Sequence, residues 1–321
     1  MTEQDASPAA QLPASFSRLA RRLHAGRFVV TAEVNPPRHA GPEPVRAEAR
    51  LLSGVVDAVN LTDCTRGIVR MSSVAAACLV REAGIEPIVQ MTCRDRNKIA
   101  LQSELMGLSA MGIHNVMLLT GDDPTQGDHP DAKPVFELNG TSLLAVANQL
   151  RGGALLSGRK LPSAPHLFLG AAGDPERDMA QSEPTRMPIS EKAAAGVDFV
   201  QTQPVFDLAR FAQWLKLLRE TGLLDRVAVL AGVFFLDSAR RAEFLRKIPG
   251  MVMPDATLQR MAAASDEQAE GLAVAVELVE QLMELDGVRG VHLMGIDASA
   301  QIRQVIDRSS LARIVAEGRD D

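Results

Sequence analysis

The chain alternates short apolar runs with longer stretches in which apolar residues recur at helical spacing. The short runs are almost continuously apolar and β-branched, which is typical of strands that are covered on both faces. The eight predicted strands span 28–34, 56–62, 86–92, 115–121, 165–172, 197–203, 227–234 and 290–296. The predicted helices that separate them span 43–53, 71–84, 97–112, 140–151, 188–195, 207–221, 238–247 and 266–286, with Asp207 as an expected N-cap.

Strict alternation of strands and helices predicts a parallel α/β fold. Eight such units close into a (β/α)₈ TIM barrel, and the competing arrangement is a doubly wound open sheet. The barrel is favoured because no predicted strand is followed by the glycine-rich fingerprint of a Rossmann fold or by a P-loop. The 321 residues suit one barrel domain over 14–321.

The two flanks of this domain are also predicted from composition. Residues 1–13 are rich in Ala, Pro and Gln and are expected to form a disordered lead, while 15–25 should be a helix that covers the barrel floor. Two long loops, 122–139 and 173–188, follow the fourth and fifth strands. They are expected at the end of the barrel where loops carry function.

Composition and charge narrow the function classes. No apolar run approaches the roughly 18 residues that a bilayer span requires, and no secretory leader is recognised, so a cytoplasmic protein is expected. The net charge of −6 argues against sequence-independent binding of nucleic acid. Cys64, Cys78 and Cys93 lack the spacing of zinc or iron–sulfur ligands, and we expect neither a metal site nor disulfides.

Polar and ionisable residues gather where the predicted strands end. The segment from Gln90 to Asn97 follows the third strand, and Asp122 follows the fourth. The first strand carries a lone acid, Glu33, among apolar residues. Burial in such surroundings raises the pKa of a carboxyl group and suits it to donate a proton, although an acid here could instead pair with a barrel arginine.

Five motifs resemble the methylenetetrahydrofolate reductase family in order and spacing. They are Glu33-Val-Asn-Pro-Pro-Arg38, Thr92-Cys-Arg-Asp-Arg-Asn97, Leu119-Thr-Gly-Asp122, Gln201-Thr-Gln-Pro-Val-Phe-Asp207 and Gly287-Val-Arg-Gly-Val-His292. The second motif is most similar to the branch found in acetogens and in fusions to homocysteine methyltransferases. The resemblance implies a flavin-carrying (β/α)₈ barrel that uses NADH or NADPH to reduce 5,10-methylenetetrahydrofolate to 5-methyltetrahydrofolate.

The resemblance also assigns roles to residues. Glu33 matches the acid that protonates N10 of the folate, Asp122 a group that holds the pterin and biases the flavin, and Gln203 an amide for the pterin or nicotinamide. Phe235, beside Phe234, is taken as a further substrate contact. The residues implied for the cofactor, FAD or alternatively FMN, are Thr62, Gln90, Thr92, Arg94, Asp95, Asn97, Thr120, Gly121, Asp122, Ala171, Ala172 and Lys192.

Departures from the family pattern leave alternatives open. An aromatic residue that follows the small pair at 171–172 in many members is Gly173 here, a frequent His is Gln90, and a folate-binding Arg corresponds to Ala298. These differences leave room for direct hydride transfer from nicotinamide without flavin. A folate-binding subunit of a larger complex, with electrons supplied by a partner subunit, is the other alternative, and a homo-oligomer is expected.

Overall fold

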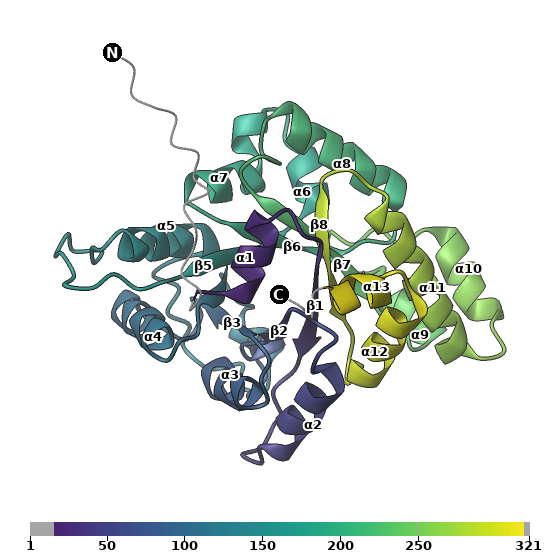
Figure 1. Cartoon of the computed structure of the whole chain (residues 1–321), viewed down its shortest axis with the longest axis horizontal. Helices are drawn as coiled ribbons and strands as arrows, with labels where there is room; N and C mark the ends of the chain where they lie inside the picture. Colours follow the sequence, from purple (N-terminus) through teal and green to yellow (C-terminus); the bar gives the residue numbers. More distant parts are fainter. Residues whose placement is uncertain (1–15, 249, 318–321) are drawn as a thin grey trace.

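Eight parallel strands form a closed barrel in the computed structural model of this protein, which describes residues 16–248 and 250–317 (Figure 1). Neighbouring strands pair in sequence order, and β8 pairs with β1. The strands are β1 (Val29–Val34), β2 (Ala58–Leu61), β3 (Pro87–Thr92), β4 (Asn115–Leu119), β5 (Phe168–Gly173), β6 (Phe199–Pro204), β7 (Ala228–Phe234) and β8 (Val288–Met294). The predicted barrel is therefore confirmed, and the open sheet is excluded.

Helices surround the barrel and bury one apolar face each against the strands (Figure 1). Those that the periodicity predicts are α2 (Glu43–Leu52), α3 (Ser73–Glu82), α4 (Lys98–Ala110), α5 (Gly140–Arg151), α7 (Pro188–Ala194), α8 (Leu208–Glu220), α9 (Ala239–Leu245) and α11 (Glu267–Met283). Asp207 caps α8, because its side chain accepts a hydrogen bond from the backbone N–H of Arg210. All eight helices that the periodicity predicts between the strands are therefore present in the structure.

Four further helices were not predicted: α6 (Pro175–Met179), α10 (Asp255–Ala263), α12 (Ser299–Arg308) and α13 (Leu311–Glu317). Helix α6 has five residues, too few to show a helical period. Helix α12 buries Ile302, Val305 and Ile306, which have the i, i+3, i+4 spacing of one helix face. It contacts α2 and α11 and completes the outer ring beside β1.

Helix α1 (Arg18–His24) covers the floor of the barrel, as the sequence predicts. Its Leu19 and Leu23 pack in a cluster with Phe168 and Phe199 from the barrel interior. The Glu86 carboxylate, before β3, accepts hydrogen bonds from the backbone N–H groups of Arg18 and Leu19. The predicted lead at 1–13 lies outside the described residues. None of the described helices is long and apolar enough to cross a membrane.

At the opposite end, the loop after β4 crosses the barrel mouth. Asp128 of this loop forms an ion pair with Arg38, at 2.8 Å, and accepts a hydrogen bond from the backbone N–H of Val69. Gly127 packs so closely on the loop after β2 that a Cβ there would lie 2.0 Å from the carbonyl oxygen of Gly67. The loops after β1, β2 and β4 therefore form one connected layer over this side of the mouth.

Candidate active site

A cavity of about 320 Å³ opens at the carboxyl ends of the strands. It lies where (β/α)₈ barrels place their active sites. Nine of the residues predicted from the sequence line it: Glu33, Gln90, Thr92, Arg94, Thr120, Gly121, Asp122, Ala172 and Gln203. The barrel thus brings together side chains from β1, β3, β5 and β6 and from the loops after β3 and β4.

Glu33 projects from β1 into this cavity and is partly buried. Burial raises the pKa of its carboxyl group from 4.5 to about 7, and a hydrogen bond with Asn35 opposes the rise. None of the described cations forms an ion pair with Glu33, so the predicted alternative of a structural pair with a barrel arginine is not what the structure contains. A carboxyl group with this pKa carries an exchangeable proton near neutral pH.

A layer of hydrogen-bonded polar side chains forms the floor of the cavity. The amides of Asn60 in β2 and Gln201 in β6 bond to each other in both directions across the barrel. Gln201 also donates to the hydroxyl oxygen of Thr31, which lies 3.0 Å from Nδ1 of His292. Burial lowers the pKa of His292 to about 3, so its ring stays neutral at physiological pH.

Asp63, two residues after the end of β2, fixes one wall of the cavity. Its carboxylate accepts hydrogen bonds from the backbone N–H and the hydroxyl group of Thr92, both at 2.9 Å. It also forms an ion pair with Arg96 at 2.7 Å. The Asp63 carboxylate is therefore held by Thr92 and Arg96 together, and it orients the predicted site residue Thr92. Sequence reasoning missed Asp63, although an acid directly after an apolar strand is a visible signal.

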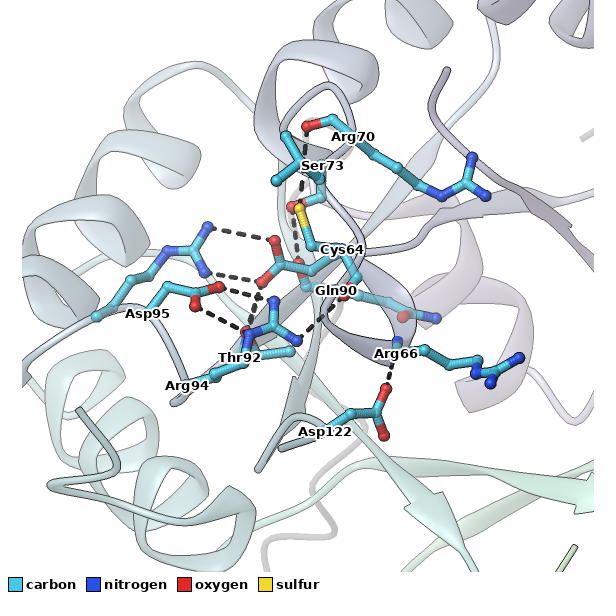
Figure 2. A network of polar contacts seen from close by, with 12 residues as sticks. Cys64, Arg66, Arg70, Ser73, Gln90, Thr92, Arg94, Asp95 and Asp122 are labelled. Carbon is cyan, nitrogen blue, oxygen red and sulfur yellow. Dashed lines mark hydrogen bonds and ion pairs between the residues drawn. The ribbon is translucent and has the colours of Figure 1, made fainter. Parts of the chain in front are cut away.

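Arg94 is buried at the cavity wall, where it contacts both Asp95 and Cys64 (Figure 2). Its guanidinium group makes two hydrogen bonds to the carboxylate of Asp95, at 2.9 and 2.7 Å, and a third to the carbonyl oxygen of Cys64. The Cys64 backbone has a left-handed conformation, with φ of 47°. Arg94 thus ties the loop after β3 to the loop after β2, and its charge is neutralised by Asp95.

Asp122 stands at the rim, where one of its oxygens accepts a hydrogen bond from the backbone N–H of Arg66 (Figure 2). The residue before it, Gly121, has φ of 92°, and a Cβ there would lie 2.9 Å from Cβ of Thr92. Only glycine fits this turn at low energy. The turn directs Asp122 into the cavity, and its second carboxylate oxygen has no partner among the described residues.

Five of the predicted cofactor residues lie outside the cavity. The Thr62 hydroxyl donates to Oδ1 of Asn35, and the Asn97 side chain caps α4. Lys192 donates from Nζ to the carbonyl oxygen of Ala172 at 2.7 Å, and burial lowers its pKa. Ala171 faces the helices, and Asp95 is half-exposed beside Arg94.

The structure also separates the two neighbouring phenylalanines at the end of β7. The predicted substrate contact, Phe235, is buried in the layer between barrel and helices. Phe234 instead lines a second cavity, which adjoins the first because Glu33 and Thr65 belong to the linings of both. No group of three or more His, Cys, Asp or Glu side chains in the described part of the chain is arranged to hold a metal ion.

A closed parallel barrel with a polar cavity and an acid of raised pKa at its carboxyl-terminal mouth is the arrangement of a (β/α)₈ enzyme. The sequence profile of the methylenetetrahydrofolate reductases matches residues 18–310, and the chain belongs to that family. This confirms the family resemblance carried by the five motifs.

Relatives are distant in sequence. Methylenetetrahydrofolate reductase 2 of Schizosaccharomyces pombe is 21% identical over 252 residues, which cover 74% of this chain and 37% of that protein. A probable methylenetetrahydrofolate reductase (NADPH) of Caenorhabditis elegans is 22% identical over 252 residues, which cover 77% of this chain and 35% of that protein. The chain therefore spans little more than a third of the length of these relatives.

Solved structures show the same architecture. A protein from Clostridium thermocellum, described as binding two copies of 5-methyl-5,6,7,8-tetrahydrofolic acid, aligns with a TM-score of 0.63 at 14% identity and covers 94% of this chain and 99% of its own. A long-chain alkane monooxygenase aligns with a TM-score of 0.54 at 10% identity and covers 91% of this chain and 92% of its own. At these identities the likeness concerns the fold alone.

Proposed function

We propose that this protein reduces 5,10-methylenetetrahydrofolate to 5-methyltetrahydrofolate with electrons from NADH or NADPH. The observation that carries this proposal is Glu33, an acid with a pKa of about 7 in the cavity of a barrel that belongs to this family. The folate ligand in the description of the Clostridium thermocellum protein is the product of the same reaction.

The chemistry requires one proton and one hydride. Protonation of N10 by Glu33 breaks the bond between N10 and the methylene carbon, and the electron pair of that bond goes to N10. The lone pair of N5 then forms a double bond to this carbon, which makes it an electrophile. A hydride, two electrons with one proton, adds to the carbon and gives the methyl group, and the nicotinamide that supplied it leaves oxidised. The cavity's part is to place the acid next to N10.

Asp122 and Gln203 complete the set of residues that we propose to hold the pterin. The free carboxylate oxygen of Asp122 can accept hydrogen bonds from pterin N–H groups. The exposed amide of Gln203 offers one donor and one acceptor to a ring edge. Below them, the amides of Gln201 and Asn60 in the floor already hydrogen-bond to each other. Binding selectivity should therefore reside in the rim residues.

A flavin remains our proposal for the cofactor. The residues that line the cavity suit the flavin ring but not the flavin phosphates. Gln90, Thr92, Thr120 and the backbone at Ala172 could hold the polar edge of an isoalloxazine, which would supply a store for hydride between nicotinamide and folate. The phosphates of FAD or FMN are less well matched. Among the described residues that line the cavity, Arg94 is the one permanent cation, and Asp95 already neutralises it. This mismatch supports direct transfer from nicotinamide as the second candidate.

The test is turnover by the purified protein. The sample is mixed with methylenetetrahydrofolate and either NADH or NADPH, and 5-methyltetrahydrofolate is measured by chromatography. The expected result is equimolar loss of reduced nicotinamide and gain of 5-methyltetrahydrofolate, with Glu33→Gln as the inactive control. If neither nucleotide yields product, with or without added FAD or FMN, the proposed function is wrong.

A further inference from the structure

Asn35 and Thr62 stand side by side just beyond the ends of two paired strands. In the register of β1 and β2, Val34 faces Leu61, so the next residue of each strand lies at the barrel mouth. The backbone N–H of Thr62 also donates to the carbonyl oxygen of Val34 at 3.4 Å. Residues two apart along a strand point to the same side, and Asn35 and Glu33 do line the same cavity.

The backbone that carries Asn35 is firmly held. Pro36 restricts the residue before it to extended conformations. The carbonyl oxygen of Pro36 accepts a hydrogen bond from Nη1 of Arg70 at 2.9 Å, and that of Pro37 accepts one from the backbone N–H of Met71 at 2.9 Å. The main freedom left to Asn35 is therefore the direction in which its side-chain amide is turned.

The hydroxyl group of Thr62 decides the direction of this amide. It donates to Oδ1 of Asn35 at 3.0 Å, and the described part of the chain offers it no other acceptor. Thr62 is only 2% exposed, so solvent has little access to the hydroxyl group. If the amide turned over, the hydroxyl group would face the NH₂ group and its proton would lose its acceptor, which costs free energy.

With Oδ1 engaged by Thr62, the NH₂ group of Asn35 is the part of the amide that is left for Glu33. An NH₂ group can donate to a carboxylate but cannot accept the proton of a neutral acid. The hydrogen bond from Asn35 therefore favours the ionised form of Glu33, whereas burial favours the neutral form. The two opposed effects leave the pKa at about 7, so the acid can both release and regain its proton near neutral pH.

The charged groups around Glu33 do not take over this role. In the reaction cavity they are the carboxylates of Asp63 and Asp122 and the paired Arg94, beside the neutral ring of His292. The second cavity, which Glu33 also lines, adds one carboxylate and five arginines: Asp297, Arg38, Arg66, Arg70, Arg240 and Arg241. None of these groups makes an ion pair or a hydrogen bond with Glu33 within the described residues, and Asn35 does bond to it.

Resting on the proposed function, in which Glu33 protonates the folate, we propose that Thr62 and Asn35 are positioning residues that control how readily this acid gives up its proton. Thr62 turns the NH₂ group of Asn35 toward the carboxyl group. When the proton passes from Glu33 to N10, the carboxylate that forms keeps this hydrogen bond, and it takes a proton from water before the next turnover. Thr62 thus acts on the acid and not on the cofactor.

The test compares the wild type with Thr62→Val, Asn35→Ala and the conservative Thr62→Ser in the full chain. The matched control is Thr221→Val, because the Thr221 hydroxyl group bonds only to carbonyl oxygens at the end of α8. Titration of isotope-labelled glutamate carboxyl carbons by NMR gives the pKa of Glu33, whose signal is the one missing from Glu33→Gln. The pH profile of single-turnover 5-methyltetrahydrofolate formation is measured in parallel.

In Thr62→Val the amide is free to turn its oxygen toward the protonated acid, which stabilises the neutral form. The pKa of Glu33 should therefore rise by about one pH unit, since a hydrogen bond to a charged group has about that effect, and the alkaline limb of the rate profile should move by the same amount. Asn35→Ala removes the donor and should shift both readouts in the same direction. Thr62→Ser and Thr221→Val should match the wild type.

The outcomes separate this inference from the proposed function. If Glu33 titrates as in the wild type in Thr62→Val or in Asn35→Ala while the folate is still reduced, the inference is wrong and the proposed function stands. An equal rise in Thr62→Ser and Thr62→Val would also overturn it, because packing and not the hydroxyl group would then be responsible. If the NMR titrations shift as expected but the wild type forms no 5-methyltetrahydrofolate, the control of the Glu33 proton stands and the proposed function falls.

Discussion

Replacing Glu33 by Gln should abolish the proton donor and at the same time stabilise the protein at neutral and alkaline pH. Glutamine has nearly the same size and can keep the hydrogen bond with Asn35. It cannot protonate N10. General acids typically contribute about 10²–10⁴-fold to a rate, so single-turnover formation of 5-methyltetrahydrofolate should slow by at least that order. Binding of NADH or NADPH should change little.

The stability gain follows from the raised pKa of Glu33. The carboxyl group has a pKa of about 7 in the folded protein and about 4.5 in the unfolded chain. At roughly 1.4 kcal/mol per unit, its ionisation costs the folded state about 3 kcal/mol. The sign is that of a group with a raised folded-state pKa: the wild type loses this stability as pH rises from about 4.5 through about 7.

The assay is urea unfolding of the wild type and of Glu33→Gln at pH 4 and pH 8. The variant should match the wild type at pH 4 and exceed it by up to about 3 kcal/mol at pH 8. The wild-type single-turnover rate should also fall above a pH of about 7, as Glu33 loses its proton. If the variant and the wild type have the same free energy of unfolding at pH 4 and also at pH 8, the raised pKa of Glu33 is refuted. If the variant forms product as fast as the wild type, the role of Glu33 as the acid is refuted.

Three further predictions concern the rim, the mouth loops and the cofactor. Asp122→Asn should keep the hydrogen bond from the backbone N–H of Arg66, so the melting temperature should not change. Folate binding, measured by titration calorimetry, should weaken about tenfold. An unchanged affinity would mean that Asp122 only anchors the loop. Gly127→Ala should destabilise the protein by about 1–3 kcal/mol, because its Cβ would meet the carbonyl oxygen of Gly67 at 2.0 Å, and thermal unfolding tests this. If the flavin proposal holds, the purified protein should show flavin absorbance in the visible range with one flavin per chain; a colourless preparation that still forms product would favour direct hydride transfer.

Much of the site could be predicted because the fold is periodic. Once the apolar runs indicated eight strands, the residues at their carboxyl ends had to meet at one mouth, and Glu33, Thr92 and Asp122 do so. The polar floor was harder to foresee. Asn60 and Gln201 lie inside strand patterns 141 residues apart, and only barrel closure makes them partners.

The sequence by itself determined the eight strands and their order, the lone acid in β1 and membership of the family. The tertiary structure decided which side chain of a neighbouring pair faces a cavity: Phe234 rather than Phe235, and Ala172 rather than Ala171. The physical reason is that successive residues of a strand point to opposite faces, so a shift of one position exchanges cavity and core. Arginines from distant loops likewise carry no common pattern in the sequence, and their convergence on one basic cavity exists only in the folded chain.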